Sequence, residues 1–512
     1  MAATNNHVVL AAIDVGTNSV KLELARPLPN GSFETLHEER DPVRPGEGVF
    51  KTGWIDKDVA ERLLSALRRY GALCRRFHAR VRAVATSAVR EAKNREEIIR
   101  RARAEAGLNL EVVSGREEAR LICLGVLHGR PAHSRALCVD IGGGSTEVAS
   151  AIGPRPVNLW SISLGAVRLT ELFDSSGKVS ARQLARMREY TGEVVGHRLP
   201  KRLGRFPKHA LGSSGTIKAV IGFAAPEGTA HVAAEHVTRA IPQLVEMGPE
   251  GRKKRFEPRR ADIIIAGAVI LEALASHLEL ESITAVDAGL RDGIIVDLIQ
   301  SHETGRSESW TTEAAEALGR RFQYDEPHGR QAARISLAVF DALRPKLGLP
   351  ASARPLLEVA ALLHDVGNAV SYAKHHRHSY YIINNADIPG LADREREIVA
   401  CVARFHRRRD LPDAGHPDMA NLTRAEAQLV RKLAALLRVA DSLDRSHNQP
   451  VHNVKVTSRG ENALLHVDVR GHVDLELWDF EREAKVFQDV FGRKIRLKLH
   501  RLPRDGDHSS RS

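Results

Sequence analysis

The chain has few aromatic residues, few cysteines and no long hydrophobic run. Phenylalanine, tryptophan and tyrosine make up 4% of its 512 residues, so stacking platforms for single-stranded nucleic acid would be sparse. The four cysteines are scattered, without a CxxC pair, which indicates neither a disulfide framework nor a cysteine metal site and suits a reducing compartment. No stretch of 18 consecutive apolar residues occurs, so no membrane span is predicted. The first residues, MAATNNHVVLAAID, lack the basic and long apolar segments of a secretory signal, and we therefore expect a cytoplasmic location.

The chain is strongly basic, with a formal net charge of +12. A basic excess of this size indicates a polyanionic partner. No zinc-finger or RNA-binding motif is present, so we expect no specific nucleic-acid partner. The clearest basic runs are Arg252–Arg255 with Arg259 and Arg260, and Arg407–Arg409. Each run suits solvated helix ends and loops as well as it suits a polyanion path.

One local pattern occurs twice in the first 300 residues. The apolar stretch VVLAAID ends at Asp14 and is followed by a turn at 16–19 and a second strand at 20–25. The stretch ALCVD ends at Asp140 and is followed by a turn at 142–146 and another strand. Such a repeat predicts two α/β domains that face each other across a cleft.

The remaining periodicity predicts the order of the other elements. In the first half we expect helices at 56–79, 87–106 and about 116–128, and strands at 81–86 and 110–113. A polar stretch at 300–312 suits a linker. Helical patterns follow, among them 329–344, 354–366, 393–406 and 423–442, and then β-type segments with one helix between them over 451–500. The expected domains are 1–133, 134–305, an all-α domain at 313–448 and a small α+β unit at 449–503, with a tail at 504–512.

The paired turns indicate phosphate chemistry. A glycine-rich turn lets backbone N–H groups point into one concavity and hold phosphate oxygens, and small hydroxyls add donors without blocking the approach. A carboxylate does not itself attract phosphate, so Asp14 and Asp140 make sense as ligands, direct or through water, of a Mg²⁺ ion that neutralises phosphate charge. One such turn would be a weak signal, but two in register are a much stronger one.

The segments AIDVGTNSVKL and VDIGGGSTEVA resemble the phosphate-binding signatures of the exopolyphosphatase and guanosine pentaphosphate phosphohydrolase (Ppx/GppA) family, which belongs to the actin-like and sugar-kinase ATPase superfamily. Further segments keep the family order across the first 300 residues: ATSAVREAKN at 85–94, VVSGREEARLICLGV at 112–126, SLGAVRLTE at 163–171, LGSSGTIKAV at 211–220 and DAGLRDGII at 287–295. The resemblance implies two actin-like (ribonuclease H-like) domains around a cleft. It also implies a homodimer, because a long channel can be built across two subunits.

The resemblance also implies roles for individual residues. Glu118 matches the position that acts as a base or positions water, and a carboxylate there can orient a water in line with the terminal phosphorus. Its neighbour Glu117 would face another way on a helix. The residues implied as metal-organising acids are Asp14, Asp140 and Glu147. Those implied as phosphate ligands are Thr17, Asn18, Ser19, Arg90, Gly142, Gly143, Gly144, Ser145, Thr146, Ser214, Gly215 and Thr216, the last three at a predicted helix N-terminus, which favours anions.

A second group of candidate residues lies in the helical part. His328, His364-Asp365 and Asp441 occur in an order that resembles the HD phosphohydrolase superfamily. Imidazole and carboxylate groups together suit a divalent metal such as Mn²⁺, Fe²⁺ or Mg²⁺, and His378 and His406 can complete a two-metal site. The alternative is a degenerate domain in which these residues only cap helices. We expect no special role for His375 and His376.

Three functions fit these observations. The first is metal-dependent hydrolysis of terminal phosphates from inorganic polyphosphate at the Asp14/Asp140 cleft, with guanosine pentaphosphate as an alternative or additional substrate. The second is an actin-like ATPase or kinase, against which the Glu-Glu-Ala-Arg segment and the short Ser-Ser-Gly-Thr loop argue. The third is a regulatory binder of alarmone nucleotides in which the HD-type domain performs any hydrolysis.

Overall fold

The repeated strand–turn–strand pattern builds two related sheets in residues 1–305, the first of two units into which the chain divides at residues 305 and 306. We describe a computed structural model for residues 8–131, 133–201, 206–226, 229–304, 307–407, 411–412, 415–459 and 462–502. The first sheet has the order β3-β2-β1-β4-β5. Its strands are β1 Leu10–Val15, β2 Val20–Pro27, β3 Phe33–Asp41, β4 Arg80–Ala85 and β5 Leu110–Val112.

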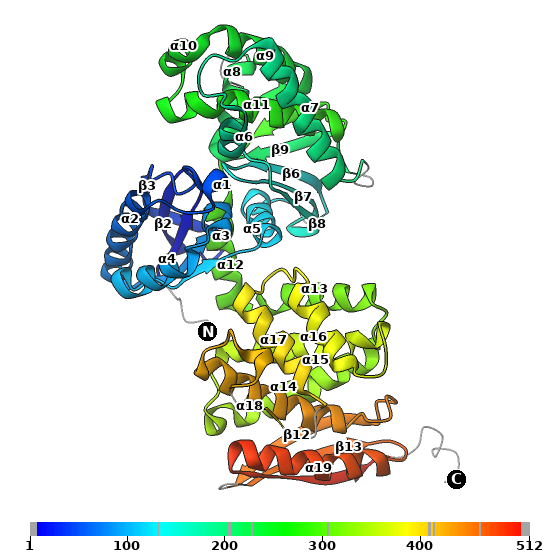
Figure 1. Cartoon of the computed structure of the whole chain (residues 1–512). Helices are drawn as coiled ribbons and strands as arrows, with labels where there is room; N and C mark the ends of the chain where they lie inside the picture. Colours follow the sequence, from blue (N-terminus) through cyan, green and yellow to red (C-terminus); the bar gives the residue numbers. More distant parts are fainter. Residues whose placement is uncertain are drawn as a thin grey trace. The chain divides into compact units, whose positions relative to one another are not determined.

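The second sheet repeats this plan and adds one edge strand. Its order is β8-β7-β6-β9-β11-β10, and Figure 1 shows it in cyan and green beside the dark blue first sheet. In both sheets the strand that carries the key aspartate pairs antiparallel with the next strand and parallel with a later one. The strands are β6 Arg135–Ile141, β7 Thr146–Ile152, β8 Arg155–Ile162, β9 His209–Ser213, β10 His231–Ala233 and β11 Ser282–Ala285.

Helices cover these sheets, and α5 (Gly115–Leu127) and α12 (Leu290–Thr304) pack against each other. Their backbones approach so closely that a Cβ atom on Gly293 would lie 1.7 Å from the carbonyl oxygen of Leu121, so only glycine fits there. The other helices are α1 Val49–Thr52, α2 Lys57–Arg76, α3 Ser87–Glu91, α4 Arg95–Arg101, the π-helical turn Ala102–Ala106, α6 Ala166–Phe173, α7 Ala181–Arg198, α8 Ser214–Ala224, α9 Ala234–Glu246, α10 Gly248–Arg255 and α11 Pro258–His277.

Two sequence-based boundaries differ from the structure. The helix expected over 87–106 is interrupted after α3, because the Asn94 amide exchanges hydrogen bonds of 3.1 and 2.9 Å with the backbone N–H and carbonyl of Ile55. This side chain-to-backbone pairing replaces the continuous helical ladder. The polar stretch at 300–312 is largely helical, since α12 reaches Thr304 and α13 begins at Ser307. The glutamate and glutamine residues of this stretch are good helix formers, so its polarity was not sufficient to predict a linker.

The second unit combines helices with a small sheet around one core. The sheet has the order β12-β13-β14, and its apolar residues share a core with the preceding helices, as Leu465 and Phe487 do with Leu436. The domains expected at 313–448 and 449–503 are therefore packed as one unit. Its elements are α13 Ser307–Arg321, α14 Glu326–Leu347, α15 Arg354–Leu363, α16 His375–Asn385, α17 Asp393–Phe405, α18 Arg424–Ser442, α19 Asp474–Phe491, β12 Val451–Arg459, β13 Asn462–Val469 and β14 Lys494–Arg501, with short 3-10 turns at Ala351–Ala353, Val366–Ala369 and Pro417–Met419.

Among the described helices, none combines the length and the apolar run needed to cross a membrane.

The basic run at 252–255 is partly structural. Arg252 is fully buried, and its guanidinium donates hydrogen bonds of 2.8 and 2.7 Å to the carbonyl oxygens of Ser176 and Gly177. Arg252 therefore stabilises the fold and is not available to a polyanion. In the second basic run, Arg408 and Arg409 lie outside the described residues.

We predict that Arg252→Ala destabilises the protein by about 3 kcal/mol, because it leaves buried carbonyl groups without donors and opens a cavity. The neighbouring Lys253 is half exposed and pairs with the exposed Glu250, so Lys253→Ala should change stability by less than about 0.5 kcal/mol. Urea unfolding of both variants measures the difference. Equal effects would show that the burial of Arg252 contributes nothing.

Candidate active site

Two β-hairpins with the same register hold the central carboxylates. The amide of Gly16 donates to the carbonyl of Ser19 at 3.1 Å, and the amide of Gly142 donates to that of Ser145 at 2.9 Å. Because both turns close in the same way, Asp14 pairs across its hairpin with Lys21, and Asp140 pairs across its hairpin with Glu147. The repeat in the sequence therefore corresponds to two hairpins with the same geometry.

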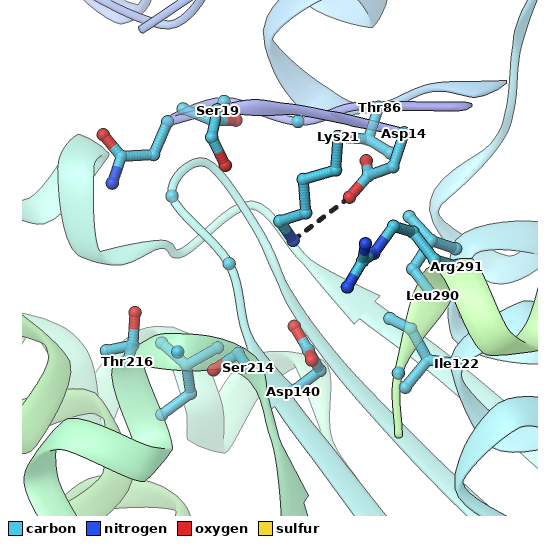
Figure 2. Close-up of a pocket in the computed structure, with 18 of the residues that line it drawn as sticks. Asp14, Ser19, Lys21, Thr86, Ile122, Asp140, Ser214, Thr216, Leu290 and Arg291 are labelled. Carbon is cyan, nitrogen blue, oxygen red and sulfur yellow. Dashed lines mark hydrogen bonds and ion pairs between the residues drawn. The ribbon is translucent and has the colours of Figure 1, made fainter. Parts of the chain in front are cut away.

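The two turns lie against each other and border one cavity of about 420 Å³. A Cβ atom on Gly143 would lie 2.7 Å from the Thr17 methyl group, so glycine permits this close approach. Figure 2 shows Asp14 and Lys21 on one side of the cavity and Asp140 on the other. The sequence-predicted residues that line the cavity are Asp14, Thr17, Asn18, Ser19, Glu118, Asp140, Gly142, Gly143, Ser145, Ser214, Gly215 and Thr216.

Four other predicted residues do not line the cavity. Thr146 is fully buried and donates its hydroxyl hydrogen to the carbonyl oxygen of Leu164 at 2.5 Å. This contact differs from the predicted phosphate contact and gives Thr146 a structural role. Gly144 packs closely against the Phe50 ring, while Arg90 and Glu147 stand behind the lining, next to Glu118.

Glu118 is a buried carboxylate that forms an ion pair with Arg90. The side chain is 7% exposed, and Arg90 donates a hydrogen bond to it at 3.1 Å. Burial raises the pKa of Glu118 from 4.5 to about 7, an effect that Arg90 opposes and that the charges of Asp14 and Asp140 increase. A carboxyl group with a pKa near neutrality is suited to accept a proton from water.

Two of the other acids, Asp14 and Glu147, have buried oxygens without a hydrogen-bond donor among the described residues. The Asp14 Oδ1 and Glu147 Oε2 atoms are buried and accept no hydrogen bond from a described residue. Burial also raises the pKa of Asp140, whose carboxylate accepts a hydrogen bond from Ser213. Buried, unsatisfied carboxylate oxygens are costly unless a cation meets them. These oxygens fit Mg²⁺, which prefers hard oxygen ligands.

Glu117, next to Glu118, points into a separate ion-pair network. Its carboxylate accepts two hydrogen bonds of 2.7 Å from Arg120, and Arg82 and Arg120 both also pair with Asp297 of α12. Neighbouring residues of a helix point about 100° apart. The network fixes α5 against β4 and α12, and so sets the position of Glu118.

The cavity also has cationic residues, of which Arg260 belongs to a basic run noted in the sequence and Lys21, Lys218 and Arg291 were not predicted. Lys21 lies 3.3 Å from Asp14, and its position follows from the hairpin register, which could have been derived by counting the residues of the turn. Arg260 donates to the Thr216 hydroxyl at 3.0 Å, and only the tertiary fold brings α11 to this place. Lys218 and Arg291 also line the cavity.

The helical unit brings most of its predicted ligands together. His328, His364, Asp365, His406 and Asp441 are buried in one cluster. His378 is not among the convergent groups of the described residues, and His375, for which no role was expected, takes part instead. His375 opens α16 with its side chain turned inward, whereas His378, one turn later, packs against Gly367.

The first unit thus joins two related α/β domains of the actin-like fold around a cleft that is lined by carboxylates and two glycine-rich turns. The chain belongs to the Ppx/GppA phosphatase family: the model of this family matches residues 28–302, and that of its domain III matches residues 311–484. These matches confirm the predicted family and make the protein a phosphatase.

Solved structures agree with this assignment. A Ppx/GppA family member from Aquifex aeolicus is 27% identical, with a TM-score of 0.50 over 58% of this chain and 99% of its own. An exopolyphosphatase-like protein is 26% identical, with a TM-score of 0.51 over 58% of this chain and 100% of its own. An exopolyphosphatase from Cytophaga hutchinsonii, 24% identical over 57% of this chain and 98% of its own, has a TM-score of 0.51 and shows the same fold.

We predict that Glu118→Gln gains stability relative to wild type as the pH rises from about 4.5 to about 7 without divalent cations. The folded pKa of Glu118 lies above its value of 4.5 in the unfolded chain. The stability that Glu118 contributes is therefore complete below about pH 4.5 and is lost as the pH rises through about 7. Glutamine has no such loss. Thermal unfolding at several pH values measures the difference.

The matched variant is Glu117→Gln, which weakens the pairs with Arg82 and Arg120. It should lower the melting temperature at every pH in this range, because it leaves buried arginines less well compensated. A wild type and a Glu118→Gln variant with parallel pH profiles would contradict the assigned environment of Glu118.

Proposed function

We propose that the protein is a Mg²⁺-dependent exopolyphosphatase that hydrolyses the terminal phosphoanhydride of inorganic polyphosphate and releases orthophosphate. The observation that carries the proposal is the convergence of Glu118, Asp14 and Asp140 on a cavity bordered by two glycine-rich turns. Phosphoanhydride hydrolysis needs a positioned water and a neutralised phosphate, and these groups suit both needs.

The roles divide among the residues by their surroundings. Glu118, with its raised pKa, orients the attacking water and accepts its proton. The turns at 16–19 and 142–145 hold the terminal phosphate, and Lys21 lies beside Asp14, where it can contact a phosphate oxygen. Asp14, Asp140 and Glu147 would hold Mg²⁺, directly or through water, and the bound ion would supply charge neutralisation at the phosphate.

The lining of the cavity favours an inorganic chain over a nucleotide. Among the described residues that line it, none is aromatic, so no ring is placed to stack on a guanine base. Five cationic side chains line the cavity: Lys21, Arg40, Lys218, Arg260 and Arg291. Such groups hold a polyanion through salt-sensitive contacts. A similar solved structure, that of an exopolyphosphatase-like protein, is consistent with this substrate.

Guanosine pentaphosphate is the second candidate substrate, because it presents a terminal phosphoanhydride to the same cleft. The match to the phosphatase family argues against the actin-like ATPase or kinase hypothesis. The hypothesis of an alarmone binder that hydrolyses in its helical domain predicts that His364→Ala abolishes activity and that Glu118 is dispensable. We also propose a homodimer, in which a long polyphosphate path would run across two subunits.

We predict that Glu118→Gln lowers phosphate release from long-chain polyphosphate with Mg²⁺ by about a hundredfold or more, the scale of a positioned acid or base. The matched control is Glu97→Gln, an exposed carboxylate on α4 outside the cavity, which should keep wild-type activity. Guanosine pentaphosphate is tested as an alternative substrate. Cleavage of the nucleotide alone would overturn the substrate and keep the cleft, while full activity of Glu118→Gln would overturn the site.

Arg260 should determine how tightly the chain is held. No described carboxylate pairs with this guanidinium, and burial lowers its pKa to about 10, helped by Arg40. A partly buried cation without an anion is stabilised by a bound phosphate. We predict that Arg260→Gln raises the KM for long-chain polyphosphate about tenfold, as expected for the loss of about 1.4 kcal/mol of binding, with kcat within about twofold.

The control for Arg260 is Arg255→Gln, which removes an exposed arginine of the same basic run. Steady-state kinetics with long-chain polyphosphate and with tripolyphosphate separate the two positions. Equal KM values in the Arg255 and Arg260 variants would contradict a specific phosphate contact at Arg260.

A further inference from the structure

Helix α6 begins directly behind the glycine-rich turn of the second domain and binds the carbonyl groups of this turn. The main-chain N–H groups of Ala166 and Val167 donate hydrogen bonds of 2.9 and 2.8 Å to the carbonyl oxygens of Gly142 and Gly143. The N–H of Arg168 also donates to the Gly143 carbonyl, at 3.0 Å. The first N–H groups of a helix have no acceptor within the helix, so the turn supplies their acceptors. The α6 backbone thus fixes two peptide groups of the turn.

The side chain of Arg168 fixes a third peptide group. Its Nε atom donates a hydrogen bond of 2.8 Å to the carbonyl oxygen of Gly144. In a planar trans peptide the N–H points opposite to the C=O, so this bond directs the N–H of Ser145 away from Arg168. Ser145 lines the cavity, where a carbonyl oxygen would repel a phosphate and an N–H group would bind it. The contact with Arg168 therefore determines which side of this peptide a phosphate meets.

The same guanidinium also contacts the first domain. It forms an ion pair with Glu91 of α3, and its carbon atom lies 4.0 Å from the centre of the Phe50 ring of α1. Glu91 directly follows Arg90, which pairs with Glu118. One side chain thus connects the glycine-rich turn of the second domain with the helix that carries the partner of Glu118.

Close packing makes the turn depend on these contacts. A Cβ atom on Gly144 would lie 2.4 Å from the Phe50 ring and 2.5 Å from the Ser87 hydroxyl. Phe50 therefore contacts both the turn and Arg168, and a guanidinium over an aromatic ring is attracted to it. The Arg168 side chain is only 18% exposed, so its hydrogen bonds are formed largely out of water, where they are stronger. Arg168 stabilises the turn both directly and through the ring.

We propose that Arg168 is a positioning residue of the exopolyphosphatase reaction, which holds the N–H of Ser145 toward the phosphate and ties the turn to α3. This role rests on the proposed function of the cleft. Arg168 is not among the described residues that line the cavity, so it acts through the peptide between Gly144 and Ser145 and not by touching the substrate. Without Arg168, binding of the terminal phosphate would have to include the cost of ordering the turn.

The test is the affinity of the full chain for inorganic phosphate in the presence of Mg²⁺, measured by isothermal titration calorimetry. Arg168→Gln should bind phosphate about tenfold more weakly than the wild type, the scale of one lost hydrogen bond to a charged group. Arg168→Lys should bind as weakly as Arg168→Gln, because an ammonium group lacks the planar fork that reaches Gly144 and Glu91 together. Circular dichroism confirms that each variant is folded.

The matched control is Arg44→Gln, which removes another ion pair between the two domains, with Asp262 at 3.0 Å. It should bind phosphate as the wild type does. Steady-state kinetics give a second readout. Arg168→Gln should raise KM by the same factor for tripolyphosphate and for long-chain polyphosphate, because the terminal phosphate is common to both, and should leave kcat within about twofold.

Three results would overturn the role of Arg168. The first is unchanged phosphate binding in Arg168→Gln. The second is restored binding in Arg168→Lys, which would show that charge alone acts, and the third is equal weakening in Arg44→Gln, which would show a general effect of contacts between the domains. Hydrolysis of polyphosphate by the wild type tests the proposed function separately. Because phosphate affinity is measured without turnover, failure of that function would not be confused with failure of the role of Arg168.

Discussion

Repulsion among buried carboxylates in one cleft is the constraint on which the first unit depends. Asp14, Glu118 and Glu147 are each at most 7% exposed, and the charges of Asp14, Glu118 and Asp140 add to the effect of burial in raising the pKa values of Glu118, Asp140 and Glu147. A fold keeps such groups together only where the surrounding structure holds them rigidly or a cation neutralises them. The twin hairpins, the Arg90 contact and the ion-pair network beside Glu117 provide the rigidity, and Mg²⁺ is the proposed cation.

The two domains provide this rigidity by repetition. Each offers one aspartate at the end of a central strand, one tight turn and one partner across the hairpin, which is Lys21 in the first domain and Glu147 in the second. The difference between these two partners makes the surroundings of the two aspartates asymmetric, with a cation beside Asp14 and an additional acid, behind the lining of the cavity, beside Asp140.

Sequence patterns correctly predicted the turns, strands and helices that depend on residues close together in the chain. The Asp-Gly turns, the strands around them and the helix that carries Glu118 were expected within a few residues of where they lie, because glycine-rich turns and hydrophobic alternation are local signals. The break after α3 was not predicted, because it depends on a contact between Asn94 and Ile55, which lie 39 residues apart. His375 was missed for the same reason, since only tertiary packing turns its side chain inward, and the basic run that contains Arg260 did not indicate which of its members lines the cavity. Thr146 has a hydroxyl group that could bind phosphate, but this hydroxyl donates its hydrogen to the carbonyl oxygen of Leu164.

We propose that the cleft holds its carboxylates in place for a cation. Infrared difference spectroscopy of the full chain, with Glu118→Gln as the reference, follows the protonated carboxyl band of Glu118 as a function of pH. We predict titration near pH 7 without divalent ions, in line with the raised pKa of Glu118, and a fall of about one unit or more when Mg²⁺ is added, because a nearby cation favours the charged form. Titration near 4.5 in both conditions, or no response to Mg²⁺, would contradict the claim.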